Sequence, residues 1–520
     1  MLQKWLMIIL AAALISMINA CSDQSNSTEP PAISICTPPI PEKIQTNLEF
    51  YSSDAQMVAA FDWAKRQALA YVFDGDPVGP WYEAALPGRE AFCMRDTSHQ
   101  AMGAQALGLG VYTQNMLYKF AENISNSKDW CSYWEINRYN YPAPVDYKND
   151  AEFWYDLPAN FDVLDCCYRM YLWTGDLSYT NNPVFQNFYR RTSIDYVNRW
   201  DLGADQVMTR ERFINLRGTF NPNDKFEYYR GDPGYAEKKE PFVCGIDLLA
   251  SQYAAYHAYA YFAAIRGDEQ AAAEFTDKAD AVRNLINTTW WDAKDNCYYG
   301  QLDANHQLTG SADASVLYYD ATDNGPKAQA ALASLISSIR KNPSSGVEGE
   351  SHYAEILYHY GVPDVAYTEI MDLTQPGRFR QEYPEVSYSV IGAIVTGLMG
   401  VSLEPSFPSE SALQGGYVEI IVKTFPALTS QTAWAQICHL PIRKNRVSVL
   451  HEGLGKTIFT NESGPALIWQ AIFPGNYAKL LVNGKPVKAE HGLEPIGRVT
   501  SWISIPVGAG DSVCVQTPSS

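Results

Sequence analysis

The spacing of apolar residues changes once along this chain of 520 residues, near Gly400. From about residue 50 to residue 400, apolar side chains recur every three or four positions, as they do on the buried face of a helix. Beyond Gly400, apolar residues alternate with polar ones, which is typical of strands. The chain is therefore expected to fold as a helical domain followed by a β domain.

The helical part contains ten segments with this spacing. They are Asp54 to Phe73, Ser98 to Ile124, Phe161 to Trp173, Gln186 to Trp200, Ile246 to Tyr261, Glu269 to Trp290, Ala328 to Arg340, His352 to Tyr360, Pro363 to Leu373 and Ser387 to Gly400. Several are joined by long polar loops, and loops of that length in a compact domain are more often functional than decorative. We expect a mainly α fold, an (α/α)6 barrel over residues 49–401, with the loops at one end lining a pocket.

The C-terminal part carries strand signals over residues 402–520. Large or small apolar residues stand at every second position from 467 to 473, namely Leu467, Trp469, Ala471 and Phe473. Further on, Asn483-Gly484 separates two short apolar runs. Asn-Gly favours the type I′ turn of a two-residue hairpin. We expect an antiparallel β-sandwich.

The first twenty residues have the features of a signal peptide. Lys4 precedes an apolar run, Leu6 to Ile18, that is too short to span a bilayer. The following Ile18-Asn19-Ala20-Cys21 resembles a bacterial lipobox, which implies cleavage before Cys21 and lipidation of that residue. Residues 21–48 are then a tether, and the protein is anchored by lipid to a bacterial membrane, on the periplasmic or cell-surface side. The alternative is an ordinary cleaved signal in which Cys21 is incidental.

The charge and the motifs exclude several classes of function. A net charge of -19 argues against nucleic acid, whose phosphates need a basic surface. The cysteines form no pair of CxxC units, and His99, His352 and His359 lack the spacing of a metal triad. Phosphate-loop, dinucleotide and nucleophile-elbow motifs are missing from the sequence. We expect neither a metal nor a cofactor.

One acid-bearing loop precedes the helical segment at Ser98. It contains Glu90 and Asp96, with Arg89 and Arg95 beside them. An apolar wall would raise the pKa of one of these carboxyls, as a general acid requires, whereas an Arg would keep it ionised. We expect either Glu90 or Asp96 to be catalytic. The alternative is that Asp96 caps the following helix.

A second acid-bearing stretch lies about 250 residues further along. Glu350 follows Gly349, and Glu385 follows Pro384, each in a loop that leads into a helical segment. We expect Glu350 or Glu385 to be the base that activates water. The alternative for Glu385 is a structural charge at a helix N-terminus.

Aromatic residues beside acids predict sugar subsites. A surplus of aromatic residues suits sugar binding, although most Tyr and Trp residues serve as core. An aromatic ring and an acid lie close together in two places, at Trp134-Glu135 and at Trp154 with Asp156. The other residues expected to bind substrate are Arg95, His99, His352, Tyr353 and Glu382.

Three stretches carry a resemblance to a known family. They are Arg89-Glu90 before Phe92 and Arg95-Asp96, then Glu350-Ser351-His352-Tyr353 with Asp364-Val365-Ala366-Tyr367, and finally Ser387-Tyr388-Ser389 to Met399-Gly400-Val401. Together they resemble the six-hairpin glycoside hydrolases, nearest to the α-L-rhamnosidase group. Two departures are that the Trp-Glu base segment of rhamnosidases has no clear counterpart and that the amino-terminal β domains are absent.

The resemblance and the acid pairs together predict an exo-acting glycoside hydrolase, inverting in stereochemistry, that removes a terminal sugar from an oligo- or polysaccharide. Two alternatives remain open. One is an unsaturated uronyl hydrolase, lyase or epimerase on the same barrel, since fold does not determine chemistry. The other is a glycan-binding lipoprotein without catalysis.

Overall fold

The computed structural model describes residues 46–211, 230–235, 242–342, 346–405 and 420–518. The predicted signal peptide, Cys21 and the tether up to residue 45 lie outside these residues. Of the helices described, none combines the length and apolarity that a bilayer crossing requires.

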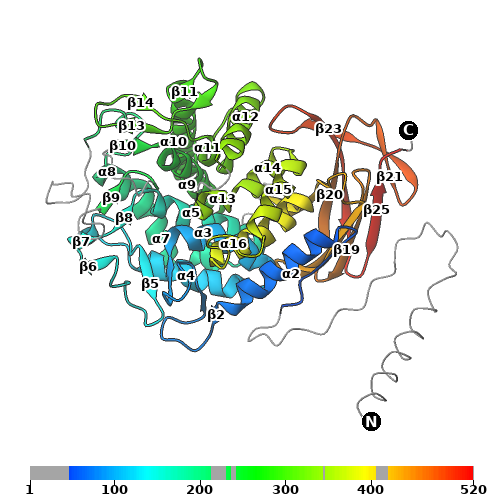
Figure 1. Cartoon of the computed structure of the whole chain (residues 1–520), viewed down its shortest axis with the longest axis horizontal. Coiled ribbons are helices and arrows are strands. Elements are labelled where there is room, and N and C mark those ends of the chain that lie inside the picture. The colour runs from blue at the N-terminus through cyan, green and yellow to red at the C-terminus, as the bar shows by residue number, and fades with distance from the viewer. Residues whose placement is uncertain (1–45, 212–229, 236–241, 343–345, 406–419, 519–520) are drawn as a thin grey trace, which may run out of the picture. The chain divides into compact units, whose positions relative to one another are not determined.

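Six helices contact one another in a closed series (Figure 1). Each packs against the next in chain order, and the last returns to pack against the first. The series consists of α3 (Met94–Ala106), α5 (Pro158–Thr174), α9 (Ile246–Ile265), α11 (Asp313–Tyr318), α14 (Tyr353–His359) and α16 (Pro384–Gly392).

A second set of helices packs against this series. α4, α10, α12 and α15 each contact the series helix that precedes them in the chain, whereas α7 contacts α4. α2 comes first in the chain, yet it packs against α16, the last helix of the series. The second set consists of α2 (Ala55–Ala70), α4 (Gly110–Glu122), α7 (Pro183–Arg190), α10 (Glu269–Thr288), α12 (Pro326–Lys341) and α15 (Pro363–Leu373).

Local sequence signals set the ends of these helices. The Asp54 carboxylate accepts hydrogen bonds from the backbone N–H groups of Gln56 and Met57, which caps α2. Proline occupies the first turn of α5, α12, α15 and α16, where its missing N–H is not needed. α5 ends at Gly175, whose φ of 64° closes the helix in the left-handed region.

The helical prediction needs two corrections. The expected helix Ser98 to Ile124 is two helices, because the chain turns at Gly108 with a φ of 84° between α3 and α4. The loops also contain short strand pairs, among them β4 (Ala91–Cys93) with β5 (Glu135–Asn137) and β8 (Tyr155–Asp156) with β9 (Arg230–Asp232). The fold is therefore mixed helix and strand rather than mainly α.

The C-terminal residues form two sheets with the features of a sandwich (orange to red in Figure 1). Side chains along β20 (Leu467–Pro474) alternate between buried and partly exposed. From β20, Trp469 stacks on Phe459 of β19 (Lys456–Ser463) in the other sheet, with ring centroids 5.0 Å apart. The sheet orders are β1-β17-β18-β19-β25-β21-β22 and β15-β16-β20-β24-β23.

One strand signal is confirmed and two predictions are wrong. Asn483-Gly484 joins β21 (Lys479–Val482) to β22 (Lys485–Lys488) as a two-residue hairpin with both φ angles positive. The sheets are not wholly antiparallel, because β16 (Ile420–Thr424) pairs with β20 in parallel. The boundary at residue 49 is also wrong, because β1 (Glu49–Ser52) pairs with β17 (Trp434–Ile442) in the C-terminal sheet.

Hydrogen bonds join the helices to the sheets. The Arg443 backbone N–H donates to the Trp173 carbonyl over 2.7 Å, and its Nε donates to the Leu172 carbonyl over 2.9 Å. Buried His451 lies 3.0 Å, through Nε2, from the carbonyl oxygen of Met399. These contacts fix the carboxyl end of α5 and the segment after α16 against the β domain.

Candidate active site

A cavity of about 470 Å³ lies among the amino ends of α3, α9, α11 and α14. Its lining combines charged groups with tyrosine rings. The titratable side chains in the lining are Arg95, His99, Tyr235, Asp247, Tyr318, Tyr319, Glu348, His352 and Tyr353. A concave surface with convergent polar groups and aromatic walls is the usual form of a small-molecule site.

A short strand pair places the first acid. β4 pairs with β5, with Cys93 opposite Glu135, and the chain passes directly from Cys93 into α3. Asp96 therefore falls in the first turn of α3, beside Arg95 on the cavity wall. The helix N-terminus carries a partial positive charge, which suits a carboxylate at this position.

The Asp96 carboxyl is buried among three donors. Cys93 Sγ and the Tyr383 hydroxyl both donate to Oδ2, the hydroxyl over 3.1 Å, and Arg95 Nη2 lies 3.1 Å from Oδ1. Burial raises the pKa of Asp96 to about 6, and the charge of Glu385 adds to the effect. Arg95 opposes both but does not cancel them.

Glu385 is a second carboxylate in direct contact with the first. It lies in the first turn of α16, after Pro384, and is fully buried. Its Oε1 is 2.9 Å from His352 Nε2 and its Oε2 is 3.8 Å from Arg95 Nη2. Burial acts to raise the pKa of Glu385, but the His352 hydrogen bond and the Arg95 charge outweigh it and hold the pKa below its usual range.

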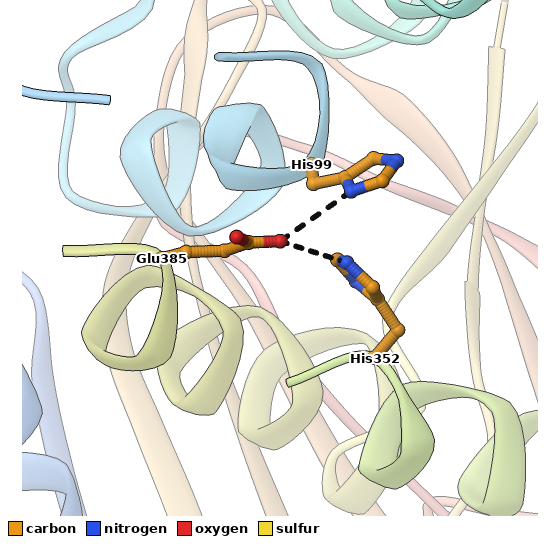
Figure 2. Close-up of side chains that lie close together, drawn as sticks. All are labelled: His99, His352 and Glu385. Carbon is orange, nitrogen blue, oxygen red and sulfur yellow. Dashed lines mark hydrogen bonds and ion pairs between the residues drawn. The ribbon is translucent and has the colours of Figure 1, made fainter. Parts of the chain in front are cut away.

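Two histidines line the cavity beside Glu385 (Figure 2). His99 of α3 lies with Nδ1 3.5 Å from Glu385 Oε1, and its ring centroid is 4.1 Å from that of His352. Neither ring nitrogen of His99 has a hydrogen-bond partner. Burial lowers the pKa of His99 well below its usual value, and the charges of His352 and Arg95 lower it further.

Asp162 is a buried carboxyl behind the cavity that the sequence prediction missed. The Tyr319 hydroxyl donates to Oδ1 over 2.6 Å, and the Tyr235 hydroxyl donates to Oδ2. Oδ2 also lies 3.9 Å from His99 Nε2. Burial raises the pKa of Asp162 to about 7, although the two tyrosine hydrogen bonds lower it. Both tyrosines line the cavity, so Asp162 reaches it through them.

The structure brings five of the predicted site residues together. Arg95, Asp96, His99, His352 and Glu385 form one cluster, although residues 95–99 and 352–385 are far apart in the sequence. Tyr353 lies in the cavity lining next to His352.

Three predicted acids lie elsewhere. Glu90 is 51% exposed and pairs with Arg138 over 2.6 Å. Glu350 is buried against Arg378, and Glu382 is exposed. The described cavity lining includes none of the three. Of the alternatives Glu90 or Asp96, and Glu350 or Glu385, the structure therefore places Asp96 and Glu385 beside the cavity. It holds Glu90 and Glu350 against arginines outside the described lining.

The predicted aromatic subsites also lie outside the described lining. Trp134 reaches toward the cavity only through Tyr235, whose ring centroid is 6.2 Å away. Glu135 is buried and bonded to Arg89; burial, with the neighbouring Asp146, raises its pKa to about 10. Trp154 and Asp156 are buried as well.

Two acids in the lining were not predicted as site residues. Asp247 lies in the first turn of α9 and accepts a hydrogen bond from the Tyr235 backbone N–H. Glu348, which pairs with Arg380, lies in α13 (Val347–Glu350). Asp247 lies two residues after Gly245, at the start of a helical segment, which was the one available signal. Glu348 lies two residues before Glu350, which was predicted in its place.

A second cavity of about 520 Å³ lies toward the carboxyl halves of α5, α9 and α14. Its charged groups form close pairs. Arg169 Nε is 2.7 Å from Asp165 Oδ2, and His359 Nε2 is 2.9 Å from Asp320 Oδ1. The first of these is an i,i+4 pair on α5. Tyr318, Tyr319 and Ile356 line both cavities and separate them.

The comparisons with known proteins give a fold and no family. The sequence matches no protein-family model and no curated protein. The structure is similar to an α-L-rhamnosidase from Dictyoglumus thermophilum, with a TM-score of 0.57 and 14% identity over 91% of this chain and 51% of that one. It is also similar to a GH78 family rhamnosidase of Bacillus sp. GL1, with a TM-score of 0.50 and 11% identity over 80% and 41%. The chain thus spans about half the length of the first and less of the second. The expected resemblance to rhamnosidases is confirmed as a likeness of fold.

Proposed function

We propose that this chain is a glycoside hydrolase whose helical region is an (α/α)6 barrel. The closed series of six helices, with a second set packed against it, supports the barrel. The fold likeness to two rhamnosidases supports the reaction class. The observation that carries the proposal is Asp96, a carboxyl with a pKa of about 6 directly behind the cavity wall.

Asp96 is the proton donor in this proposal. A general acid must hold its proton near the working pH and release it to the glycosidic oxygen. Burial and the adjacent Glu385 keep the proton on Asp96, while Arg95 and the Tyr383 hydroxyl stabilise the carboxylate left after transfer. Arg95 lies in the cavity lining and Asp96 does not, so proton transfer requires the Arg95 side chain to move aside.

Glu385 does not serve as the base. The two carboxyls of a glycosidase stand about 5–9.5 Å apart, because a sugar, with or without a water, lies between them. Asp96 and Glu385 instead lie against the same nitrogen, Arg95 Nη2, which is 3.1 Å from Asp96 Oδ1 and 3.8 Å from Glu385 Oε2. Glu385 is better suited to tune Asp96, and the base is one of the two carboxylates in the lining, Asp247 or Glu348.

We propose removal of a terminal sugar with inversion of configuration. The cavity volume of about 470 Å³ is large enough for one or two sugar rings rather than an extended chain. Its tyrosines supply stacking faces, and its acids and Arg95 supply hydrogen bonds to hydroxyl groups. An α-L-rhamnoside is the first substrate to test, because both rhamnosidase neighbours are similar in fold.

The test is a screen of the mature chain carrying Cys21→Ser against aryl rhamnosides, glucuronides and galactosides and against oligosaccharides. Product anomers are followed by NMR. We expect release of one monosaccharide with inverted configuration, and loss of release in Asp96→Asn. Binding of a polysaccharide without release of any sugar would overturn the proposal in favour of a glycan-binding protein, and an unsaturated product would indicate a lyase.

The cellular location is proposed from the sequence alone. We propose that Cys21 carries the lipid and that residues 22–45 connect the folded part to a bacterial membrane. Two or more acyl chains hold a protein stably on a bilayer. Mass spectrometry of the mature N-terminus should find acyl groups on Cys21, and Cys21→Ser should move the protein from the membrane fraction to the soluble fraction. An unmodified Cys21 would leave an ordinary cleaved signal.

A further inference from the structure

His99, His352 and Glu385 present three ligand atoms to one point (Figure 2). His99 Nδ1 and His352 Nε2 both face Glu385 Oε1, at 3.5 and 2.9 Å, and all ligand atoms of the group lie within 4.8 Å of one another. Zinc bonds of about 2.0–2.2 Å to nitrogen and oxygen place tetrahedral ligands roughly 3.4 Å apart. The observed distances lie on either side of that value.

His99 has ring nitrogens without a hydrogen-bond partner, and a bound cation would give one of them a ligand bond. Its side chain is 8% exposed, yet neither of its ring nitrogens has a hydrogen-bond partner. A buried polar group without a partner destabilises the fold, so such groups in a native structure call for an explanation. A metal at Nδ1 would leave Nε2 pointing at Asp162 Oδ2, 3.9 Å away. Carboxylates commonly orient metal-bound histidines in this way.

The local charges are compatible with a cation. Arg95 is a positive group beside the site, but it faces Glu385 Oε2, whereas the histidines face Oε1. Asp96 and Asp162 add two further carboxyls within contact of the group. Both histidines line the cavity, so a metal here would keep an open position toward it. Two histidines, one Glu and an open position make up a known catalytic zinc arrangement.

We propose that His99, His352 and Glu385 bind one divalent transition-metal ion of the zinc class. The ion would hold a water or a sugar hydroxyl at its open position and so orient the substrate in the cavity. This site goes beyond the hydrolysis proposed above and does not depend on it, because metal binding is measured without a substrate.

The test uses the whole mature chain without a histidine tag, treated with a chelator and then dialysed. Zn²⁺ binding is measured by calorimetry and Co²⁺ binding by its visible absorption. We expect one ion per chain and an absorption pattern of four- or five-coordinate cobalt. His99→Ala and Glu385→Gln should each weaken Zn²⁺ binding at least about 100-fold. Crystals soaked in Zn²⁺ should show an anomalous peak between the three side chains.

A matched control separates the site from adventitious binding. His491→Ala makes the same change at an exposed histidine of strand β23 (Glu490–Leu493), and it should leave the affinity within about twofold of the unsubstituted chain. His352→Gln provides a second ligand variant in case His99→Ala does not fold, as judged by circular dichroism of the metal-free forms. Absence of binding, or binding unchanged in His99→Ala, His352→Gln and Glu385→Gln, would overturn the proposal and leave a hydrogen-bonded His352–Glu385 pair.

Discussion

The two cavities of the helical region hold similar groups in different states. Both contain carboxyls, an arginine and histidine, and both border Tyr318 and Tyr319. In the second cavity two of the acids stand in close pairs, Asp165 with Arg169 and Asp320 with His359. Behind the wall of the first, Asp96 and Glu385 lie beside the same arginine and Asp162 is a buried acid, while His99 in the lining has two ring nitrogens without a hydrogen-bond partner.

Both cavities contain charged groups, so the presence of charge does not distinguish a reactive site from a structural one. The distinction lies in whether each carboxyl faces a cation alone or is also crowded by a second carboxyl. A carboxyl in a close ion pair stays ionised and stabilises the fold. A carboxyl held beside a second carboxyl keeps its proton to a pH near neutrality. Its ionisation above that pH lowers the free energy of unfolding. If the comparison is correct, the same substitution in the two cavities should have different effects on activity and opposite effects on the free energy of unfolding.

The largest expected effect is on catalysis. Asp96→Asn removes the transferable proton, so kcat/KM on the substrate found in the screen should fall about 100- to 10,000-fold. Asp165→Asn, the same change in the second cavity, should lower it less than about tenfold. Steady-state kinetics at pH 6 on both variants, with folding checked by circular dichroism, tests the contrast. Equal losses in the two variants would remove the distinction between the cavities.

The pH profile gives the next effect. A proton donor with a pKa of about 6 is active below that pH and loses its proton above it. We expect kcat/KM to fall about tenfold for each pH unit above pH 6, and Asp165→Asn to keep the same profile. Rates measured from pH 4 to pH 9 in buffers of constant ionic strength decide this. A flat profile between pH 6 and pH 8 would exclude Asp96 as the donor.

Stability should change with opposite signs at the two cavities. Because the folded-state pKa of Asp96 is raised from 3.8 to about 6, its ionisation opposes folding above pH 6 and has no such effect below pH 3.8. Asp96→Asn should therefore raise the free energy of unfolding at pH 8 by up to about 3 kcal/mol, relative to its effect at pH 3.5. Asp165→Asn leaves Arg169 without its carboxylate partner and should lower the free energy of unfolding by about 1–3 kcal/mol.

Urea unfolding at both pH values measures this pair of changes. The fluorescence of the tryptophans reports the transition, and an unchanged slope against urea shows that the denatured state is comparable. A loss of stability in both variants at pH 8 would contradict the destabilisation that we assign to ionised Asp96.

The smallest effect concerns the exposed pair in the second cavity. His359 and Asp320 have side chains about half exposed, so solvent screens their attraction. His359→Ala should change the free energy of unfolding by less than about 1 kcal/mol and leave kcat/KM unchanged. Thermal unfolding at low and high salt checks the first point. A large loss of activity would mean that the second cavity takes part in the reaction.

The sequence predicted the broad fold because that fold follows from local patterns. The helical spacing up to residue 400, the alternation after it and the Asn483-Gly484 hairpin are all found. The sequence did not predict that β1 pairs with β17, because a four-residue strand carries too little pattern to name a partner so far along the chain. Nor did it predict the parallel pair of β16 and β20, which depends on the order of strands in space.

The site was predicted in part, for a reason visible in two pairs of acids. Asp96 and Glu385 stand in the first turns of neighbouring helices, so a loop-before-helix signal found both. Glu90 and Glu350 carry the same signal, yet Arg138 and Arg378 hold them elsewhere, and no local pattern reveals those partners. Asp162 was missed because its importance comes from Tyr235 and Tyr319, which reach it from distant segments.

The pairing of β1 with β17 has a consequence for synthesis of the chain. Ser52 and Trp434, which are joined by a hydrogen bond, lie 382 residues apart. At about 5–20 residues per second, the first strand leaves the ribosome roughly 20–80 seconds before its partner exists. Until then its edge is open to other chains, which is an aggregation hazard for any unpaired strand. A holding chaperone that covers residues 46–53 during this interval would therefore raise the yield of the folded protein.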